Sequence, residues 1–249
     1  MNGNDVLCKI LIGGEIKGKR GVNLPDSDLS ISCLTEKDKK DLEFGVENDV
    51  DFFALSFVRK PADIDELREI LKNKGSKAKI IAKIETPQAI QNIDEIIEKA
   101  DGLMVARGDL AIEIPAEKVP FAQKEMIRKC NDAGKPIITA TQMLESMIHS
   151  PVPTRAEVSD VANAILDGTD AIMLSEETTL GNFPIEAVNM MSKVAKEVEA
   201  NYPEREIIHS TNQNINVVTD SITGSAVKMA HNTNAKAIIC LTHSGLLLE

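Results

Sequence analysis

Short apolar runs alternate with amphipathic stretches along the middle of this chain. Five of the runs have the length and the β-branched content of buried strands, and they cover residues 50–58, 79–85, 102–106, 136–143 and 171–174. A helical pattern follows each of them, so the strand–helix unit repeats about every 30 residues, as in βαβ folds. Strands that alternate with helices form a parallel sheet, and the pattern therefore predicts an α/β fold with a closed or an open sheet.

Capping residues and prolines mark where the helices begin. Thr35, with Asp38 three positions later, predicts the N-cap of a first helix, and Thr86 followed by Pro87 predicts the start of another. Helices are expected over 61–74, 87–99 and 119–131. Each of these three follows an apolar run, which supports the repeated unit.

The first residues of the chain follow a different pattern. A mostly apolar stretch over residues 6–12 and the segment Glu15–Lys17 flank Gly13 and Gly14, which predicts a β-hairpin that turns on the paired glycines. We therefore assign residues 1–23 to a separate β element and the α/β region to residues 24–203.

The last residues predict the opening of another domain. Pro203 ends the last long helix, and the polar residues 204–214 are typical of a linker. We then expect a helix over 217–232 and a strand over 235–241. Residues 204–249 are accordingly interpreted as a linker and the beginning of a second α/β domain.

The composition excludes several classes of partner. The chain has 249 residues, 43% of them hydrophobic, which is enough for a substantial core. A formal net charge of −11, with no Trp and a single Tyr, is a poor match to nucleic acid, which requires basic surfaces and aromatic platforms. No apolar run approaches the roughly 20 residues of a membrane span, and no signal-peptide pattern is found. Four scattered cysteines suit a reducing compartment, so a cytoplasmic protein is predicted.

The most informative polar residues are Lys83 and Glu85, which lie in an otherwise apolar strand signal. Side chains alternate between the faces of a strand, so these two share one face and the apolar residues share the other. A buried Lys needs an anionic partner, and a Glu beside it can hold a cation. Taken alone, the pair favours a structural ion pair over a functional site.

Polar groups close the other four strands as well, and together they favour a functional site. They are Ser56 and Arg59; Arg107, Gly108 and Asp109; Thr139 and Thr141; and Ser175, Glu176 and Glu177. In parallel α/β architectures the active site lies at the carboxyl ends of the strands, so these clusters are expected to converge.

The residue types at these strand ends indicate a class of chemistry. Glu85 and Asp109 could jointly hold one Mg²⁺, and Lys83 is a suitable positive charge for a phosphoryl group in transfer. Gly108 lets backbone N–H groups approach an anionic ligand closely. The residues alone therefore predict a Mg²⁺-assisted enzyme that acts on a small phosphorylated or carboxylated substrate.

Several long motifs resemble those of the pyruvate kinase family. They are Gly21–Pro25, Leu34–Asp38, Ile80–Glu85, Met104–Leu110, Ile112–Pro115, Ala140–Met147 and Pro153–Glu157. The resemblance runs over nearly the whole chain. It implies a partial (β/α)8 TIM barrel with strands 4 to 8, a remnant of a β lid domain, and the beginning of a C-terminal α/β regulatory domain. It also implies phosphoryl transfer from phosphoenolpyruvate to ADP, giving pyruvate and ATP, in glycolysis.

Carried over residue by residue, the resemblance assigns roles within the site. Lys83 matches the residue that stabilises the phosphoryl group, and Glu85 and Asp109 match the ligands of Mg²⁺ or Mn²⁺. The backbone N–H groups of Gly108 and Asp109 match the binders of the substrate carboxylate. Thr141 matches the residue beside the enolpyruvate that is linked to protonation of its methylene carbon. The resemblance also gives a supporting network of Arg107, Ser175 and Glu177.

Other parts of the family's enzyme have no match in this sequence. These are the first three barrel strands, the substrate-binding Arg, the ligands of K⁺ (a candidate cofactor of the parent protein) and most of the lid. Thr242–Gly245 resembles only the start of an effector-binding phosphate loop. The chain is thus interpreted as a central fragment of an allosteric homo-oligomer, a tetramer. Because phosphoryl transfer depends on complete positioning and charge neutralisation, the fragment is expected to be inactive or nearly so alone.

Two alternatives remain open at this point. The chain could be a non-catalytic module for assembly or partner binding, since five barrel strands leave two sheet edges that can pair with another chain. It could instead be another Mg²⁺-dependent enolate-chemistry barrel enzyme, although Met104–Leu110 and Ala140–Met147 resemble pyruvate kinase specifically.

Overall fold

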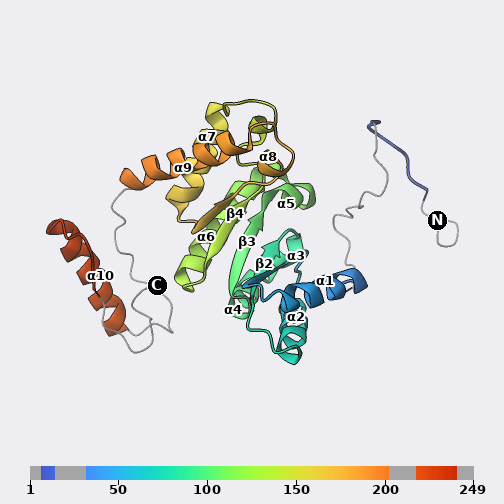
Figure 1. Ribbon diagram of the computed structural model, residues 1–249, viewed down its shortest axis with the longest axis horizontal. Helices are drawn as coiled ribbons and strands as arrows, with labels where there is room; N and C mark the ends of the chain where they lie inside the picture. Colours follow the sequence, from blue (N-terminus) through green and yellow to red (C-terminus); the bar gives the residue numbers. More distant parts are fainter. Residues whose placement is uncertain (1–6, 15–31, 202–216, 240–249) are drawn as a thin grey trace.

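Five parallel strands form a single sheet at the centre of the chain (Figure 1). The computed structural model describes residues 7–14, 32–201 and 217–239. The strands are β1 (Phe52–Leu55), β2 (Lys79–Ile84), β3 (Gly102–Ala106), β4 (Ile137–Ala140) and β5 (Ala171–Met173). Each pairs in parallel with the strand that follows it in the chain. This order confirms the predicted α/β fold and is consistent with consecutive units of a (β/α)8 barrel.

Helices lie between the strands at most of the predicted places. α1 (Glu36–Glu47) precedes β1, α2 (Pro61–Asn73) follows it, and α3 (Pro87–Gln91) and α4 (Ile93–Lys99) lie between β2 and β3. α5 (Arg107–Glu113), the 3₁₀ helix η1 (Ala116–Lys118) and α6 (Val119–Asp132) connect β3 to β4. The 3₁₀ helix η2 (Glu145–Ile148) and α7 (Arg155–Asp167) connect β4 to β5. α8 (Glu176–Thr179), α9 (Pro184–Ala200) and α10 (Val217–Asn232) follow β5.

Side-chain caps explain two of the helix starts. Thr35 Oγ1 accepts a hydrogen bond from Asp38 N at 3.2 Å, and the Asp38 carboxylate accepts one from Thr35 N at 2.7 Å. This reciprocal capping box confirms the predicted start of α1. Thr86 Oγ1 accepts from Ala89 N at 3.2 Å and caps α3 in the predicted way.

The helix predicted over 87–99 is wrong as a single element, because the chain breaks at Asn92. This residue lies between α3 and α4 with φ −101° and ψ 19°, values that do not continue an α-helix. Its side-chain amide donates to Arg59 O at 2.8 Å, so a contact with the loop after β1 stabilises the interruption. Asn side chains commonly compete with the backbone for hydrogen bonds in this way.

The two faces of the sheet have different surroundings. α2, α4 and α6 lie over the face where the even-numbered residues of β2 join the main hydrophobic core. Ile81 instead packs with Met104 and Ala140 on the opposite face. Because side chains alternate along a strand, Lys83 and Glu85 share the face of Ile81, as the sequence predicts.

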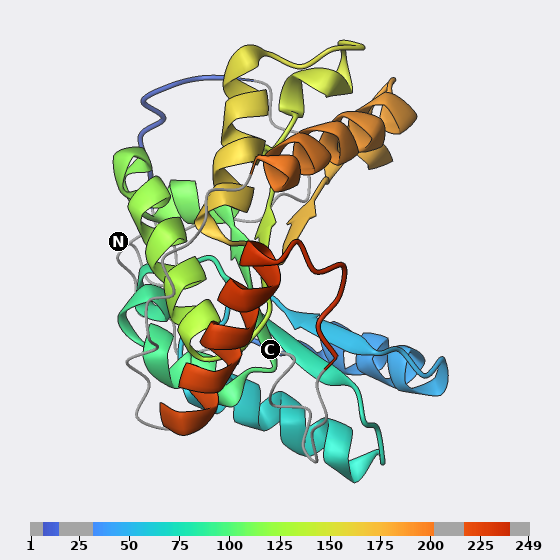
Figure 2. The ribbon, with the colours of Figure 1, turned by 90° about the vertical axis from the view of Figure 1, so that its left-hand side faces the viewer.

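α7 and α9 pack against each other beside β4 and β5, and Figure 2 shows α9 crossing α7. Both helices contribute to a second hydrophobic cluster, which also includes residues from the segment after β4. Its members are Met143, Leu144, Met147, Val161, Ala164, Ala187, Met191 and Val194. Met143, Leu144 and Met147 lie in the segment between β4 and α7. The cluster therefore anchors the segment in which the predicted site residue Thr141 lies.

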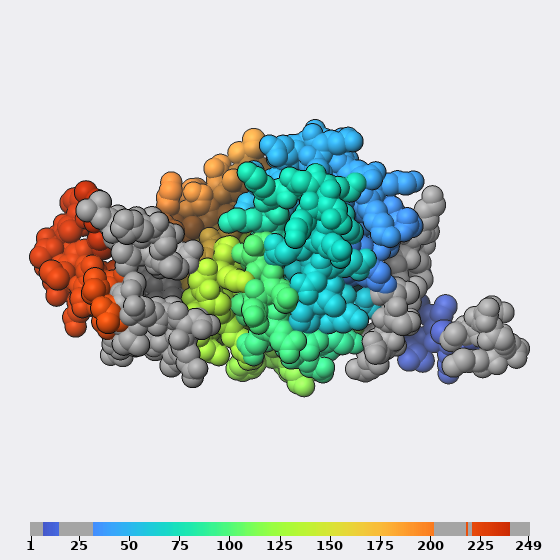
Figure 3. Space-filling model, turned by 90° about the horizontal axis from the view of Figure 1, so that it is seen from below, coloured from blue at the N-terminus to red at the C-terminus, as the bar shows by residue number. Residues whose placement is uncertain are grey.

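The strands predicted near the two ends are wrong as far as the described residues extend. Residues 7–14 contain no strand and residues 235–239 contain none, whereas α10 confirms the helix predicted over 217–232. Figure 3 shows α10 and residues 7–14 at opposite ends of the molecule. A short strand is stable only beside partners in a sheet, and the five-stranded sheet does not include either segment. Outside the described residues lie the remainder of the hairpin, the linker 204–214, residues 240 and 241, and Thr242–Gly245.

None of the described helices combines the length and the apolar character that a membrane-spanning helix needs.

Candidate active site

Lys83 and Glu85 form an ion pair at the carboxyl end of β2, with 2.7 Å between Lys83 Nζ and Glu85 Oε1. Lys83 Nζ also donates to Ser56 Oγ at 2.8 Å, and Phe57 N donates to Glu85 Oε2 at 2.6 Å. Glu85 is fully buried, while 23% of the Lys83 side chain is exposed. The structure thus brings the predicted residues of β1 and β2 together, with the ammonium group nearer to solvent than the carboxylate.

Glu85 Oε1 is neutralised by the Lys83 ammonium and retains lone-pair capacity for a further ligand. It is buried and accepts no hydrogen bond from the described residues, although it lies within ion-pair distance of Lys83 Nζ. A buried carboxylate oxygen in this state suits a hard cation, which prefers oxygen ligands. The described residues contain no group of three His, Cys, Asp or Glu side chains placed to hold a metal. A cation here would therefore rely on Glu85, with Asp109 from the next strand end, and on non-protein oxygens, as is usual for Mg²⁺.

Gly108 and Asp109 lie in the first turn of α5, directly after β3. The sequence did not predict this helix, because Ala106 stands at its N-cap and makes no side-chain cap. Gly108 N donates to Thr141 Oγ1 at 2.7 Å, which joins the ends of β3 and β4. A Cβ on Gly108 would lie 3.4 Å from Thr141 Oγ1, which is an ordinary contact distance, so this approach does not by itself require glycine.

Left-handed backbone occurs at three bulky residues beside these strand ends. Phe57 has φ 53°, Thr141 has φ 66° and Gln142 has φ 52°. Such a conformation is uncommon without glycine, especially for a β-branched residue, and costs on the order of 1–3 kcal/mol per residue. Strained backbone of this kind clusters at functional sites, and here it lies at the ends of β1 and β4.

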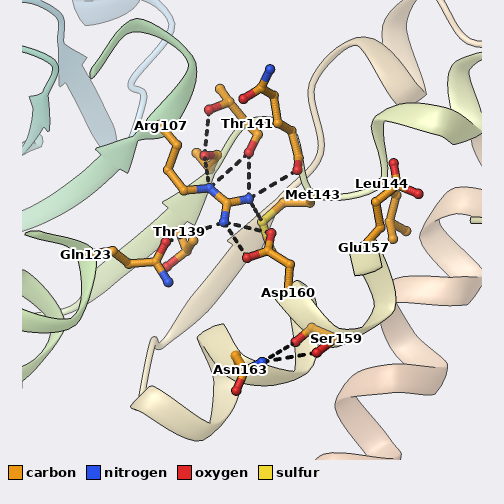
Figure 4. A network of polar contacts seen from close by, with 12 residues as sticks. Arg107, Gln123, Thr139, Thr141, Met143, Leu144, Glu157, Ser159, Asp160 and Asn163 are labelled. Atoms are coloured by element: carbon orange, nitrogen blue, oxygen red, sulfur yellow. Dashed lines mark hydrogen bonds and ion pairs between the residues drawn. The ribbon is translucent and has the colours of Figure 1, made fainter. Parts of the chain in front are cut away.

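Arg107 is buried between β3, β4 and α7 (Figure 4). Its Nη1 donates to Asp160 Oδ1 at 2.8 Å and lies 2.7 Å from Oδ2, and it is also 3.4 Å from Gln123 Oε1. The remaining nitrogens face backbone carbonyls after β4, and Nη2 also lies 2.8 Å from Met143 Sδ. The resemblance gives Arg107 a supporting role, but Asp160 and Gln123 carry no local sequence signal, because only the fold brings α6 and α7 to this side chain.

Glu177 joins the end of β5 to the segment after β4. Its Oε1 accepts from Leu144 N at 3.1 Å and its Oε2 accepts from Ser175 N at 2.8 Å. Glu177 is only 2% exposed, so both bonds are shielded from water. The predicted pair Ser175 and Glu177 is therefore together in space, next to the Thr141 segment.

Two other predicted polar groups lie away from these contacts. Thr139 is fully buried, and its Oγ1 donates to Thr169 Oγ1 at 3.0 Å. It pairs with Val105 of β3, so its side chain lies on the face of the sheet that carries the main hydrophobic core. Its placement beside Thr141 in one cluster is wrong, because Thr141 follows the end of β4 with a left-handed backbone, which interrupts the alternation of the strand, and its hydroxyl contacts Gly108 instead. Arg59 N donates to Asp63 Oδ2 at 2.9 Å and so belongs to the start of α2.

Glu157 ties η2 to α7 in the loop after β4. Its carboxylate accepts hydrogen bonds from Ser146 N and Oγ at 2.7 and 2.6 Å, and from Thr154 N and Oγ1 at 2.7 and 2.8 Å. Burial acts to raise the pKa of this carboxyl, but the hydrogen bonds from Ser146 and Thr154 outweigh it, and the pKa is lowered.

We expect Glu157→Gln to lower the free energy of unfolding at neutral pH by about 1–3 kcal/mol, the usual cost of losing hydrogen bonds to a charged group. Because the folded-state pKa is below the unfolded one, this stabilisation is present above the unfolded pKa and is lost as the pH falls through the folded pKa. Urea unfolding over a range of pH measures it, and the difference between variant and wild type should shrink in acid. The control is Glu186→Gln on the exposed start of α9, which should change little.

Comparison with known proteins decides the family. The profile described as "Pyruvate kinase, barrel domain" matches residues 1–188. The chain belongs to the pyruvate kinase family. A pyruvate kinase of Clostridium perfringens (strain 13 / Type A) is 52% identical over 249 residues, which cover 98% of this chain and 52% of that protein. A pyruvate kinase of Bacillus licheniformis is 50% identical over 243 residues, covering 97% of this chain and 42% of that protein.

A solved structure agrees with the sequence matches. The crystal structure of a pyruvate kinase from Cryptosporidium parvum is similar with a TM-score of 0.84 and 47% identity, covering 91% of this chain and 48% of that chain. The chain thus spans about half the length of the pyruvate kinases it matches. Residues 1–188 match the barrel domain of pyruvate kinase, and membership of this family removes the alternative of a different enolate-chemistry barrel enzyme.

Proposed function

We propose that this chain carries the later part of a pyruvate kinase active site, which transfers a phosphoryl group from phosphoenolpyruvate to ADP. The observation that carries the proposal is the Lys83–Glu85 ion pair at the carboxyl ends of the parallel strands, in which the fully buried Glu85 carboxylate lies 2.7 Å from Lys83 Nζ. Family membership supports the reaction class, since the relatives are pyruvate kinases.

Lys83 would stabilise the transferred phosphoryl group. Its ammonium is held by Glu85 and Ser56 but remains partly exposed at the strand end, so a phosphate oxygen can reach it. Phosphoryl transfer is accelerated chiefly by positioned charge of this kind.

Glu85 and Asp109 would hold Mg²⁺ or Mn²⁺. The fully buried Glu85 supplies a fixed oxygen, and the half-buried Asp109 at the start of α5 supplies a more accessible one. When bound, the cation would neutralise negative charge on the phosphoryl oxygens. Calorimetric titration with either metal tests this assignment, because binding should disappear in a variant that carries Glu85→Gln and Asp109→Asn.

Gly108 and Asp109 would receive the substrate carboxylate through their backbone N–H groups, with Thr141 beside the enolpyruvate. Gly108 N–H is donated to Thr141 Oγ1 in this structure. A carboxylate at Gly108 would therefore have to share or replace that bond, which would free the Thr141 hydroxyl as the substrate arrives. Arg107, Ser175 and Glu177 would support this arrangement from behind.

The properties of the whole enzyme are part of the same proposal. They are a cytoplasmic glycolytic role, a tetrameric and allosteric assembly, ATP binding and K⁺ dependence with ligands outside this chain. Within the chain, residues 1–23 would belong to the β lid domain, 24–203 to the barrel, and 204–249 to the linker and C-terminal domain.

A second candidate function is non-catalytic assembly, and exposed residues of β1 favour it. Phe52 is 52% exposed and Ala54 is also exposed, on the face of the sheet that Ile81 shares. β1 is an edge strand, and an exposed apolar edge can pair with a strand from another chain. A polypeptide that continued the sheet from this edge and closed it over the same face would cover both side chains.

A further inference from the structure

One guanidinium contacts three successive carbonyl groups at the end of β4, those of residues 140–142. Arg107 Nε and Nη2 donate to Thr141 O at 3.2 and 2.8 Å, Nη2 lies 3.3 Å from Gln142 O, and Nε lies 3.4 Å from Ala140 O. Figure 4 shows the planar group set between this turn and Asp160. Arginine has five donors in a fixed plane, so it can serve several acceptors at once, whereas lysine presents a single charged nitrogen.

The turn that Arg107 contacts is in an unfavourable conformation. Thr141 and Gln142 both have positive φ, and neither is glycine. The carbonyl oxygens of residues 140–142 also converge on the buried Arg107 guanidinium. Without this cation their partial negative charges would repel one another. The contacts of Arg107 therefore compensate for the strain of this turn.

The same turn fixes the Thr141 hydroxyl. Thr141 Oγ1 donates to Ala140 O at 2.7 Å and accepts from Gly108 N at 2.7 Å, so both its proton and a lone pair have set directions. If Thr141 relaxed to an ordinary backbone conformation, its side chain would leave Gly108. The position of the hydroxyl thus depends on whatever holds the turn.

We propose that Arg107 is a positioning residue that keeps residues 141 and 142 left-handed and so sets the Thr141 hydroxyl against the Gly108 amide. Asp160, on α7, holds the guanidinium from the other side. The catalytic meaning of the hydroxyl rests on the proposed function, whereas the geometric claim does not.

Amide hydrogen exchange at Gly108, measured by NMR on the full chain, tests the proposal. This amide lies in the first turn of α5, where no intrahelical acceptor exists, so its protection depends on Thr141 Oγ1. In Arg107→Lys, which keeps the charge opposite Asp160, Gly108 should exchange at least tenfold faster. The amide of Leu103, which donates to Pro136 O at 2.9 Å within the sheet, should keep its wild-type rate.

Three further variants make the test specific. Arg68→Lys is the matched control. Arg68 also donates to a carbonyl, Lys99 O, and to a carboxylate, Asp101, but these residues precede β3 and lie at the amino ends of the strands. This variant should leave Gly108 exchange unchanged. Adding Gln142→Gly to Arg107→Lys should restore part of the protection, because glycine adopts positive φ without strain. Asp160→Asn, which leaves the guanidinium in place, should accelerate Gly108 exchange even if Arg107→Lys does not fold.

Two results would overturn the proposal. The first is a wild-type exchange rate at Gly108 in Arg107→Lys. If Arg107→Lys does not fold, the same result in Asp160→Asn has this meaning. The second is equal acceleration at Gly108 and Leu103, which would make Arg107 a general contributor to stability. Titration of the wild-type chain with Mg²⁺ alone separates this question from the proposed function. Absence of binding there, with selective acceleration at Gly108, would reject the function and retain the positioning role.

Discussion

Lys83→Met should lower the free energy of unfolding by about 3–5 kcal/mol, because it leaves the Glu85 carboxylate buried without its cation. Glu85 has no exposed surface, and its Oε1 has no hydrogen-bonded partner among the described residues that could compensate. The remaining bond, from Phe57 N to Oε2, satisfies only one oxygen. Urea-induced unfolding of both chains at neutral pH measures the difference.

A matched lysine separates this effect from the general loss of an ion pair. Lys129 Nζ lies 2.6 Å from Asp94 Oδ1, but Asp94 is 76% exposed, so Lys129→Met should cost no more than about 1 kcal/mol. Adding Glu85→Leu to Lys83→Met should recover much of the lost stability, because no charge then remains buried. Equal costs for the two single lysine variants would contradict the account of Lys83 as the necessary partner of a buried carboxylate.

The isolated chain should turn over phosphoenolpyruvate and ADP at least 100-fold more slowly than a full-length relative such as the Clostridium perfringens enzyme. Its described residues form a five-stranded parallel sheet, and the chain spans about half the length of that protein. Positioning of both substrates and neutralisation of several negative charges contribute multiplicatively to the rate, so half a site retains little of it. A coupled assay for pyruvate formation measures the turnover of each protein.

The Lys83→Met chain serves as the control for contaminating host enzyme in this assay. Any turnover that persists unchanged in the variant cannot come from the proposed site. Turnover of the wild-type chain within 100-fold of the full-length relative, and abolished by Lys83→Met, would contradict the expectation that the site needs the whole barrel.

Local patterns were enough to predict the strand–helix order and the pairing of Lys83 with Glu85. The bounds of β3 and α10 match their predictions. The spacing of apolar residues along a segment follows from which of its side chains are buried, so it indicates the type and the extent of the element. The alternation of side chains along β2 likewise depends on backbone geometry alone, and it set the two charged residues on one face.

Features that depend on contacts between distant segments were not predictable in this way. The interruption at Asn92 arises from a bond to Arg59, and α5 begins without a capping residue. The left-handed turn at Thr141 is held by Arg107 and Asp160, which lie far from it in sequence. No local propensity predicts such strain, since local preferences oppose it.

The most direct measurement is a calorimetric titration of the chain with Mg²⁺ or Mn²⁺, beside the Glu85→Gln, Asp109→Asn variant. A second variant, Glu117→Ala with Glu125→Ala, removes two exposed carboxylates and controls for the loss of charge alone. The account predicts binding by the wild-type chain and by this control, and no binding by the first variant. Equal binding by all three, or no binding by the wild-type chain, would contradict the claim that this chain forms its part of a pyruvate kinase metal site.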